Sequence, residues 1–284
     1  MSKRSSLMDR RALFSSAVAA TLLAATGVSA AGPTRGGRLR MALSGASRTD
    51  TWLLGNGLFM QVARQGIVFD TLTEIAADGT LRGELAVDWT SSDDAREWIF
   101  DLRPGVSFHD GAPFTAQDVV ASAKGFSEGQ VRALNSHQVS FLLKKPDPGL
   151  PMRLAQPEFY IRSAHAPDSG IGTGLYKVHH FSPGQRLLTK RVTTHYKQDA
   201  GWFDEVELSS IPSEPVRGQA LAEYLVDAVD INDPRSLGDI PQITFFPNTR
   251  TPTQAVSADV LHPSQVSSLR PLDNLRAAER WWFA

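Results

Sequence analysis

The 284-residue sequence contains no cysteine, and this absence excludes several kinds of structure and chemistry at once. The protein can form no disulfide bond, hold no metal ion through thiolates and use no cysteine nucleophile. Its stability must therefore come from a hydrophobic core. A chain of this length with 42% hydrophobic residues can build one.

Motifs for catalysis and for phosphate binding are also missing. The sequence has no HExxH pair and no G-x-S-x-G nucleophile motif, and Gly172-Thr173-Gly174 lacks the lysine of a phosphate-binding loop. His109-Asp110-Gly111 is interpreted as a turn, and the adjacent His179 and His180 would point to opposite faces of a strand. We therefore expect no enzyme activity, no metal ion and no cofactor.

The sequence has no large excess of charge of either sign, with 29 Lys and Arg against 30 Asp and Glu and a net charge of -1. Such a balance does not favour nucleic acid as a partner. Beyond residue 30 no apolar run is long enough to span a bilayer, so we expect no stable membrane insertion.

The first 30 residues differ from the rest of the chain. Basic residues at 3, 4, 10 and 11 precede an uncharged, alanine-rich stretch from Ala12 to Ala30. This layout predicts a secretory signal peptide over residues 1–30, cleaved near Ala30, which would place the mature protein in the periplasm. The Arg10-Arg11 pair is similar to a twin-arginine signal, the general secretory route being the alternative. An uncleaved membrane anchor is the other reading of the stretch.

The remaining sequence alternates strand and helix patterns, which predicts a mixed α/β fold. A helix is expected within Trp52–Phe69, and another begins after Thr115, where Asp118 completes a capping sequence. A third is expected over Pro215–Leu225. Strands are expected at 38–43, 71–75, 81–89, 97–102, 138–143, 174–180, 186–192, 206–211 and 228–231.

Three stretches resemble the extracellular solute-binding proteins of family 5. Residues 69–122 (FDTLTEIAADGTLRGELAVDWTSSDDAREWIFDLRPGVSFHDGAPFTAQDVVAS) carry the family's signature region. IGTGLYKV at 171–178 is similar to a GTGPYK motif, and Ala222–Ile231 resembles an element ending in a Val-Asp-Ile strand. The resemblance implies a periplasmic-binding-protein-like lobe with a mixed sheet and flanking helices, α/β with α+β character.

Family members are nearly twice as long, and most of their additional chain forms a second lobe. The resemblance thus implies a short form with the second lobe largely missing: a solute-binding lobe over residues 31–233 and a proline-rich C-terminal segment, 234–284, returning to the same lobe. The aromatic residues Trp281, Trp282 and Phe283 of that segment are expected to pack onto the lobe.

By the same resemblance, the chain is the substrate-binding component of an ABC transporter for uptake of peptides or similar small solutes, with the transporter permease as its partner. Ser44, Trp52 and Asn56 follow the first strand and are candidate ligand-binding residues, as is Gly174 through its backbone. The ring of Trp52 offers a stacking surface, and the polar side chains offer hydrogen bonds. The alternative is a one-lobed interaction or signalling protein that has lost ligand binding.

Overall fold

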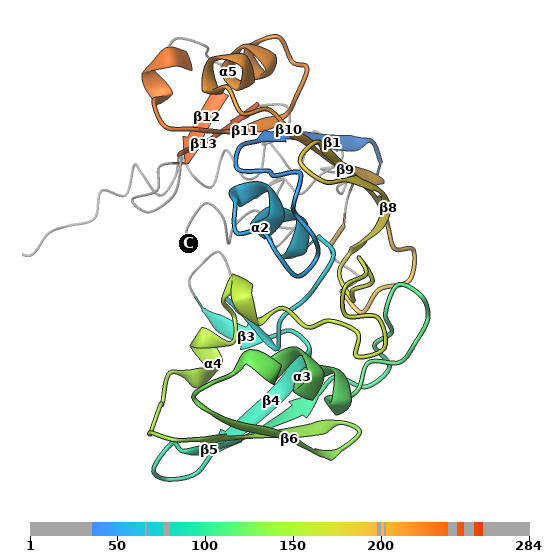
Figure 1. The fold of residues 1–284 in the computed structure, drawn as a ribbon, viewed down its shortest axis with the longest axis vertical. Helices are drawn as coiled ribbons and strands as arrows, with labels where there is room; N and C mark the ends of the chain where they lie inside the picture. Colours follow the sequence, from blue (N-terminus) through green and yellow to red (C-terminus); the bar gives the residue numbers. More distant parts are fainter. Residues whose placement is uncertain are drawn as a thin grey trace, which may run out of the picture. The chain divides into compact units, whose positions relative to one another are not determined.

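The computed structural model describes residues 36–65, 67–75, 80–197, 200–201, 203–237, 243–246 and 253–257. They form an α/β structure with a seven-stranded mixed sheet, a four-stranded antiparallel sheet and a two-stranded ribbon of β2 (Thr73–Ile75) and β3 (Leu81–Gly83). Figure 1 shows these elements coloured along the chain.

The seven-stranded sheet has the order β12-β13-β11-β1-β10-β9-β8. Its central strand β1 pairs in parallel with β10 on one side and β11 on the other, and the remaining pairs are antiparallel. The strands are β1 (Arg38–Leu43), β8 (Tyr176–Ser182), β9 (Arg186–Arg191), β10 (Glu205–Ser210), β11 (Ala228–Ile231), β12 (Ile243–Phe246) and β13 (Thr253–Ser257).

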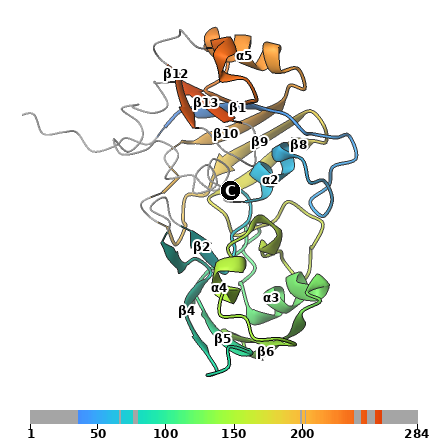
Figure 2. The ribbon, with the colours of Figure 1, turned by 90° about the vertical axis from the view of Figure 1, so that its left-hand side faces the viewer.

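Both faces of this sheet are covered, as the alternation of side chains along β1 illustrates. Leu39, Met41 and Leu43 pack into a core shared with helix α2 (Leu58–Arg64), whereas Ala42 belongs to a second core with helix α5 (Glu214–Ala222). Figures 1 and 2 show α2 and α5 on opposite sides of the sheet. A 3-10 turn, η3 (Pro234–Leu237), adds Leu237 to the second core.

The four-stranded sheet has the order β4-β5-β7-β6 and its own hydrophobic core. It consists of β4 (Ala86–Ser91), β5 (Glu97–Leu102), β6 (Gly129–Asn135) and β7 (Gln138–Leu143), with α3 (Ala116–Ser122), α4 (Leu150–Arg153) and the 3-10 turns η1 (Ala123–Gly125) and η2 (Pro157–Phe159). Helix α3 begins where the capping sequence predicts, since the Asp118 carboxylate accepts the Thr115 backbone N–H at 2.8 Å.

The helix predicted within 52–69 is much shorter than expected. Only Leu58–Arg64 is helical, because Gly55 has a φ of +98° and Gly57 packs against the backbone of Gly45. A Cβ at Gly57 would lie 1.8 Å from the Gly45 carbonyl oxygen, so tertiary packing holds this stretch in a loop.

Strands β6, β12 and β13 were not predicted. β6 is an edge strand that pairs only with β7, and the half-burial of Val131 and Ala133 leaves a weak alternation. β12 and β13 are short strands between the prolines of the C-terminal segment. Pairing holds them in the sheet, β13 with β11 and β12 with β13.

Within the part of the chain described, no helix is long and apolar enough to cross a membrane. The predicted signal peptide, residues 1–30, and the aromatic residues Trp281, Trp282 and Phe283 lie outside the described residues.

Candidate functional site

The carboxyl ends of the three parallel strands lie side by side at one edge of the seven-stranded sheet. Leu43 at the end of β1 pairs with Ser210 of β10, and Ala42 pairs with Val229 of β11. Ligands of open α/β sheets bind outside this edge, where the strands give way to loops. The candidate site therefore comprises the loops that follow β1, β10 and β11, and we call it the carboxyl edge.

A buried carboxylate, that of Asp230, holds Ser44, the first residue after β1. Asp230 of β11 is fully buried, and it accepts hydrogen bonds from the Ser44 backbone N–H at 2.8 Å and from the Ser44 hydroxyl at 2.6 Å. Both donors of Ser44 are thus used within the protein. The hydroxyl oxygen keeps its lone pairs, so Ser44 can offer a ligand an acceptor at a fixed position.

A buried guanidinium joins the three elements behind the edge. Arg217 of α5 is 2% exposed and donates to the Asp230 carbonyl at 2.9 Å and to the Asp230 carboxylate at 3.2 Å. Its Nη1 donates to the carbonyls of Ile211 and Pro212 just after β10, at 2.7 and 2.9 Å. Charged groups are buried at acceptable cost only with such complete pairing.

The loop between β1 and α2 is also held in one conformation. Arg64 of α2 donates to the carbonyls of Thr51 and Gly55 at 2.7 Å each and to that of Leu54. Burial lowers the pKa of the Arg64 guanidinium. A loop fixed in this way loses little further entropy when a ligand binds.

The four predicted site residues have different surroundings. Trp52 is only 6% exposed and packs against Phe69 and Phe181, with ring centroids 5.8 and 4.9 Å away, so little of its ring is left for stacking on a ligand. Asn56 is exposed in the same loop, and its side-chain amide bonds to none of the described residues. Ser44 and Asn56 thus share the carboxyl edge.

Gly174, the fourth, lies away from that loop, in the segment before β8. Its backbone N–H donates to the Val68 carbonyl at 2.9 Å, and its carbonyl accepts from His109 Nε2 at 2.8 Å. It lines a cavity of about 480 Å³ that reaches from Gly105 to Tyr196. The role of Gly174 in ligand binding stays a prediction, as do those of the other three residues.

Two histidines hold the Gly172-Thr173-Gly174 segment. His109 accepts the Gly172 N–H at Nδ1, which leaves its Nε2 to donate to Gly174. His195 accepts the Lys197 N–H at Nδ1 (3.0 Å) and donates from Nε2 to the Thr173 carbonyl at 2.8 Å. Both rings are therefore neutral, with the proton on Nε2.

Burial lowers the pKa of both His109 and His195 and outweighs the attraction of the nearby Asp70 carboxylate. The unfolded chain takes up protons on these rings near pH 6.5, whereas the folded protein resists protonation until lower pH. Stability is thus full above about pH 6.5 and falls as the pH drops toward the folded-state values, by at most about 1.4 kcal/mol per pH unit for each histidine.

We expect urea unfolding at pH 7.5, 6.0 and 5.0 to show this decline and His109→Gln to reduce its slope. His179→Gln, at an exposed position of β8, is the matched control and should retain the wild-type slope. If the wild type, His109→Gln and His179→Gln all lose stability equally as the pH falls, the decline does not come from His109.

A buried charged cluster that the sequence did not reveal lies beside this segment. The Lys197 ammonium contacts the carboxylates of Asp70, Glu74 and Glu84, and all four side chains are at most 10% exposed. Desolvation by burial, together with the nearby Asp70 and Glu84 charges, raises the pKa of Tyr196 well above its usual value. The described residues contain no group of three or more His, Asp or Glu arranged to hold a metal ion.

The model of the bacterial extracellular solute-binding proteins, family 5, matches residues 80–258, which is more than half of the chain. The chain belongs to this family. Family 5 proteins are non-enzymatic solute-binding components of transport, in agreement with the expectation that no catalytic chemistry is required.

Curated relatives agree with this membership. The chain is 30% identical over 200 residues to a probable peptide ABC transporter periplasmic-binding protein of Sinorhizobium fredii, covering 61% of this chain and 36% of the relative. It is 33% identical over 180 residues to the HTH-type transcriptional regulator SgrR of Shigella dysenteriae, covering 56% and 31%.

Solved structures of the family share the fold. The PBP AgaA of A. tumefaciens, in complex with agropinic acid, has a TM-score of 0.67 and 26% identity over 74% of this chain and 47% of its own. DppA of Helicobacter pylori, bound to a peptide, has a TM-score of 0.65 and 22% identity over 75% and 50%. The family 5 chain described here thus spans half or less of the relatives it matches.

Sequence reasoning does not identify Asp230 and Arg217, the two residues that support the carboxyl edge from behind. Asp230 is the central residue of the Val-Asp-Ile strand, so its position in a family motif was the available signal. Arg217 gave none, because a single arginine in a helix is usually exposed.

Proposed function

We propose that this family 5 chain provides one wall of the ligand-binding cleft of a periplasmic substrate-binding protein and takes up peptides or similar small solutes for an ABC transporter. The observation that carries the proposal is the carboxyl edge, where Asp230 and Arg217 fix Ser44 and Arg64 fixes the loop bearing Asn56. Peptide-binding relatives support the solute class, and ordered water at such an edge can accommodate different side chains.

Export and the transporter permease belong to the same proposal. We infer that residues 1–30 direct export and that residues 31–233 form the solute-binding lobe. The relatives that bind peptides are named as periplasmic proteins, which supports this location. A second wall would come from further polypeptide or from a partner, because hinge closure around a ligand requires two bodies.

Calorimetric titration of the full chain with a set of dipeptides and tripeptides tests the proposal. We expect binding that raises the melting temperature and that weakens several-fold in Asn56→Ala, since one exposed hydrogen-bonding group is removed from the edge. Asn135→Ala, which removes an exposed amide from the β6–β7 turn, is the matched control and should bind like the wild type. No heat and no thermal shift with any peptide would contradict the proposal.

The second candidate is an interaction or signalling module without a transport role. It is favoured by the matches to transcriptional regulators, in which a stretch similar to this lobe occurs in a protein that is not named as a transporter component. Permease and ATPase genes next to the gene for this chain would favour transport. Their absence, together with a stable complex between this chain and a regulatory protein, would favour signalling.

A further inference from the structure

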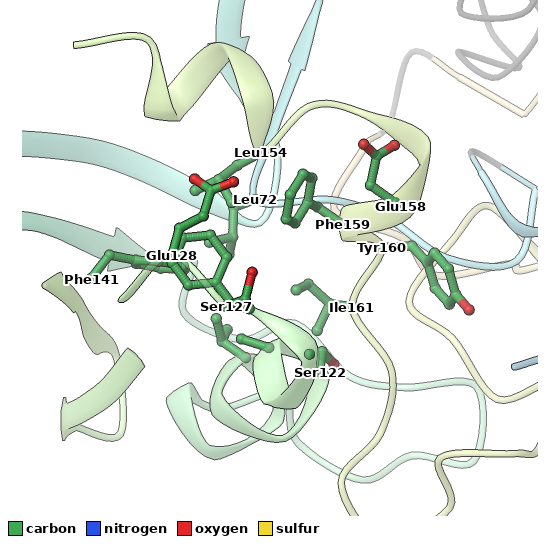
Figure 3. Close-up of a pocket in the computed structure, with 14 residues that line it drawn as sticks. Leu72, Ser122, Ser127, Glu128, Phe141, Leu154, Glu158, Phe159, Tyr160 and Ile161 are labelled. Carbon is green, nitrogen blue, oxygen red and sulfur yellow. The ribbon is translucent and has the colours of Figure 1, made fainter. Parts of the chain in front are cut away.

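A pocket of about 300 Å³ opens beside the core of the four-stranded sheet, between α3, η1 and η2. Its floor is made of side chains that are at most 4% exposed: Leu72, Phe141, Leu154 and Ile161. Figure 3 shows Phe159 and Phe141 on two sides of the pocket and Ser127 between Phe141 and Ile161. The pocket belongs to none of the elements of the carboxyl edge.

The walls of this pocket are aromatic and already ordered. Phe126 packs edge-on against Phe141 and Phe159, with centroid distances of 5.6 and 6.4 Å. The Ser122 hydroxyl accepts the Arg162 N–H at 2.9 Å, and the Ser127 carbonyl accepts from the Lys144 ammonium at 2.7 Å. Apolar atoms that face such a space lack packing partners, so an apolar guest gains contacts that the protein alone does not provide.

The charged side chains that line the pocket are both acidic. Its lining includes the carboxylates of Glu128 and Glu158 and contains no lysine, arginine or histidine. Glu158 is exposed and forms no ion pair with any described residue. Glu128 pairs with Arg153, which also contacts Asp147. The Glu128 side chain is 55% exposed, so solvent screens its carboxylate and the pair is weak. Figure 3 shows the two carboxylates on opposite sides of Phe159.

We propose that this pocket is a second ligand site, which binds a small apolar cation: an aromatic or branched aliphatic group that carries a protonated amine. The ring enters the space that Phe126, Phe141 and Phe159 line, and the ammonium stays near Glu128 or Glu158, where water still reaches it. A dry apolar cavity of about 150 Å³ holds benzene, so about 300 Å³ accommodates a ring with a short chain. Binding here is independent of the peptide site proposed above.

Ligand-observed NMR titration of the full chain tests the site with 2-phenylethylamine as the probe. Phenylacetate carries the same ring with the opposite charge, and ethylamine carries the charge without the ring. We expect 2-phenylethylamine to bind at least about tenfold more tightly than either. Equal binding of phenylacetate would overturn the charge assignment and with it the proposal.

Variants locate the site. Ser127→Phe places a ring at the rim and should abolish binding, while the double change Glu128→Gln and Glu158→Gln should remove the preference for the amine. Glu97→Gln with Asp93→Asn, both exposed on and before β5, controls for loss of negative charge. Asn56→Ala should leave the binding unchanged, so failure of the peptide site and failure of this pocket are distinguishable. Unchanged affinity in Ser127→Phe would place the probe elsewhere and refute the site.

Discussion

Gly172→Ala should destabilise the protein by about 3 kcal/mol or more, because the added methyl group has no space. A Cβ at this position would lie 1.8 Å from the Val68 carbonyl oxygen and 2.7 Å from the Phe69 ring. The oxygen belongs to backbone and cannot rotate away, so the chain must shift and the hydrogen bonds to His109 must lengthen or break. Urea unfolding measured at pH 7.5 checks the value.

The matched control for this change is Gly125→Ala. An added Cβ at Gly125 meets no atom within 4 Å, and the residue does not require a positive φ. The substitution restricts the unfolded chain without a clash, so stability should stay the same or rise by a few tenths of a kcal/mol. Similar losses for both variants would mean that the close approach of Gly172 to Val68 is not what makes alanine unacceptable there.

Arg217→Met should destabilise the protein by about 3 to 5 kcal/mol, the usual cost of removing one partner of a buried ion pair. Methionine fills similar space but leaves the Asp230 carboxylate buried with only the two Ser44 donors, and it leaves the carbonyls of Ile211 and Pro212 without their donor. Thermal unfolding should show a melting temperature lower by roughly 6 to 20 °C, at 2 to 4 °C per kcal/mol.

Arg235→Met is the control for this prediction. Arg235 also pairs with an aspartate, Asp233, at 2.8 Å, but its side chain is 89% exposed, so its loss should leave the melting temperature essentially unchanged. The functional consequence should differ in the same way. Any peptide affinity should fall with Arg217→Met, because Asp230, which positions Ser44, loses its buried partner, and persist with Arg235→Met. A stable Arg217→Met protein with full peptide affinity would show that the carboxyl edge does not depend on this network.

Much of the architecture follows from local patterns. The alternation of β1, the capping residues Thr115 and Asp118, and the turn at Asp110-Gly111 are each set by interactions within a few residues, and the structure has them where the sequence predicts. Family membership likewise rests on contiguous motifs, above all residues 69–122, and needs no coordinates.

The tertiary structure decided the points that depend on residues distant in sequence. Helix α2 begins only at Leu58, because the backbone of Gly57 packs against that of Gly45. The ring of Trp52 is buried because Phe69 and Phe181 surround it. No periodicity contains such information. A pattern over a few residues records which face is apolar, but not which remote side chain covers it.

The candidate site shows the same division. Ser44 and Asn56 could be selected from the sequence, because the family resemblance implies that the loop after the first strand lines the cleft. That Ser44 is held by Asp230, 186 residues away, and Asp230 by Arg217, follows only from the parallel pairing of β1 with β11 and the packing of α5. The sequence alone determined the family and the loops in which candidate ligand-binding residues lie. The close approach of strands far apart in the chain determined which of those side chains are held in place, because burial and hydrogen bonding are set by neighbours in space.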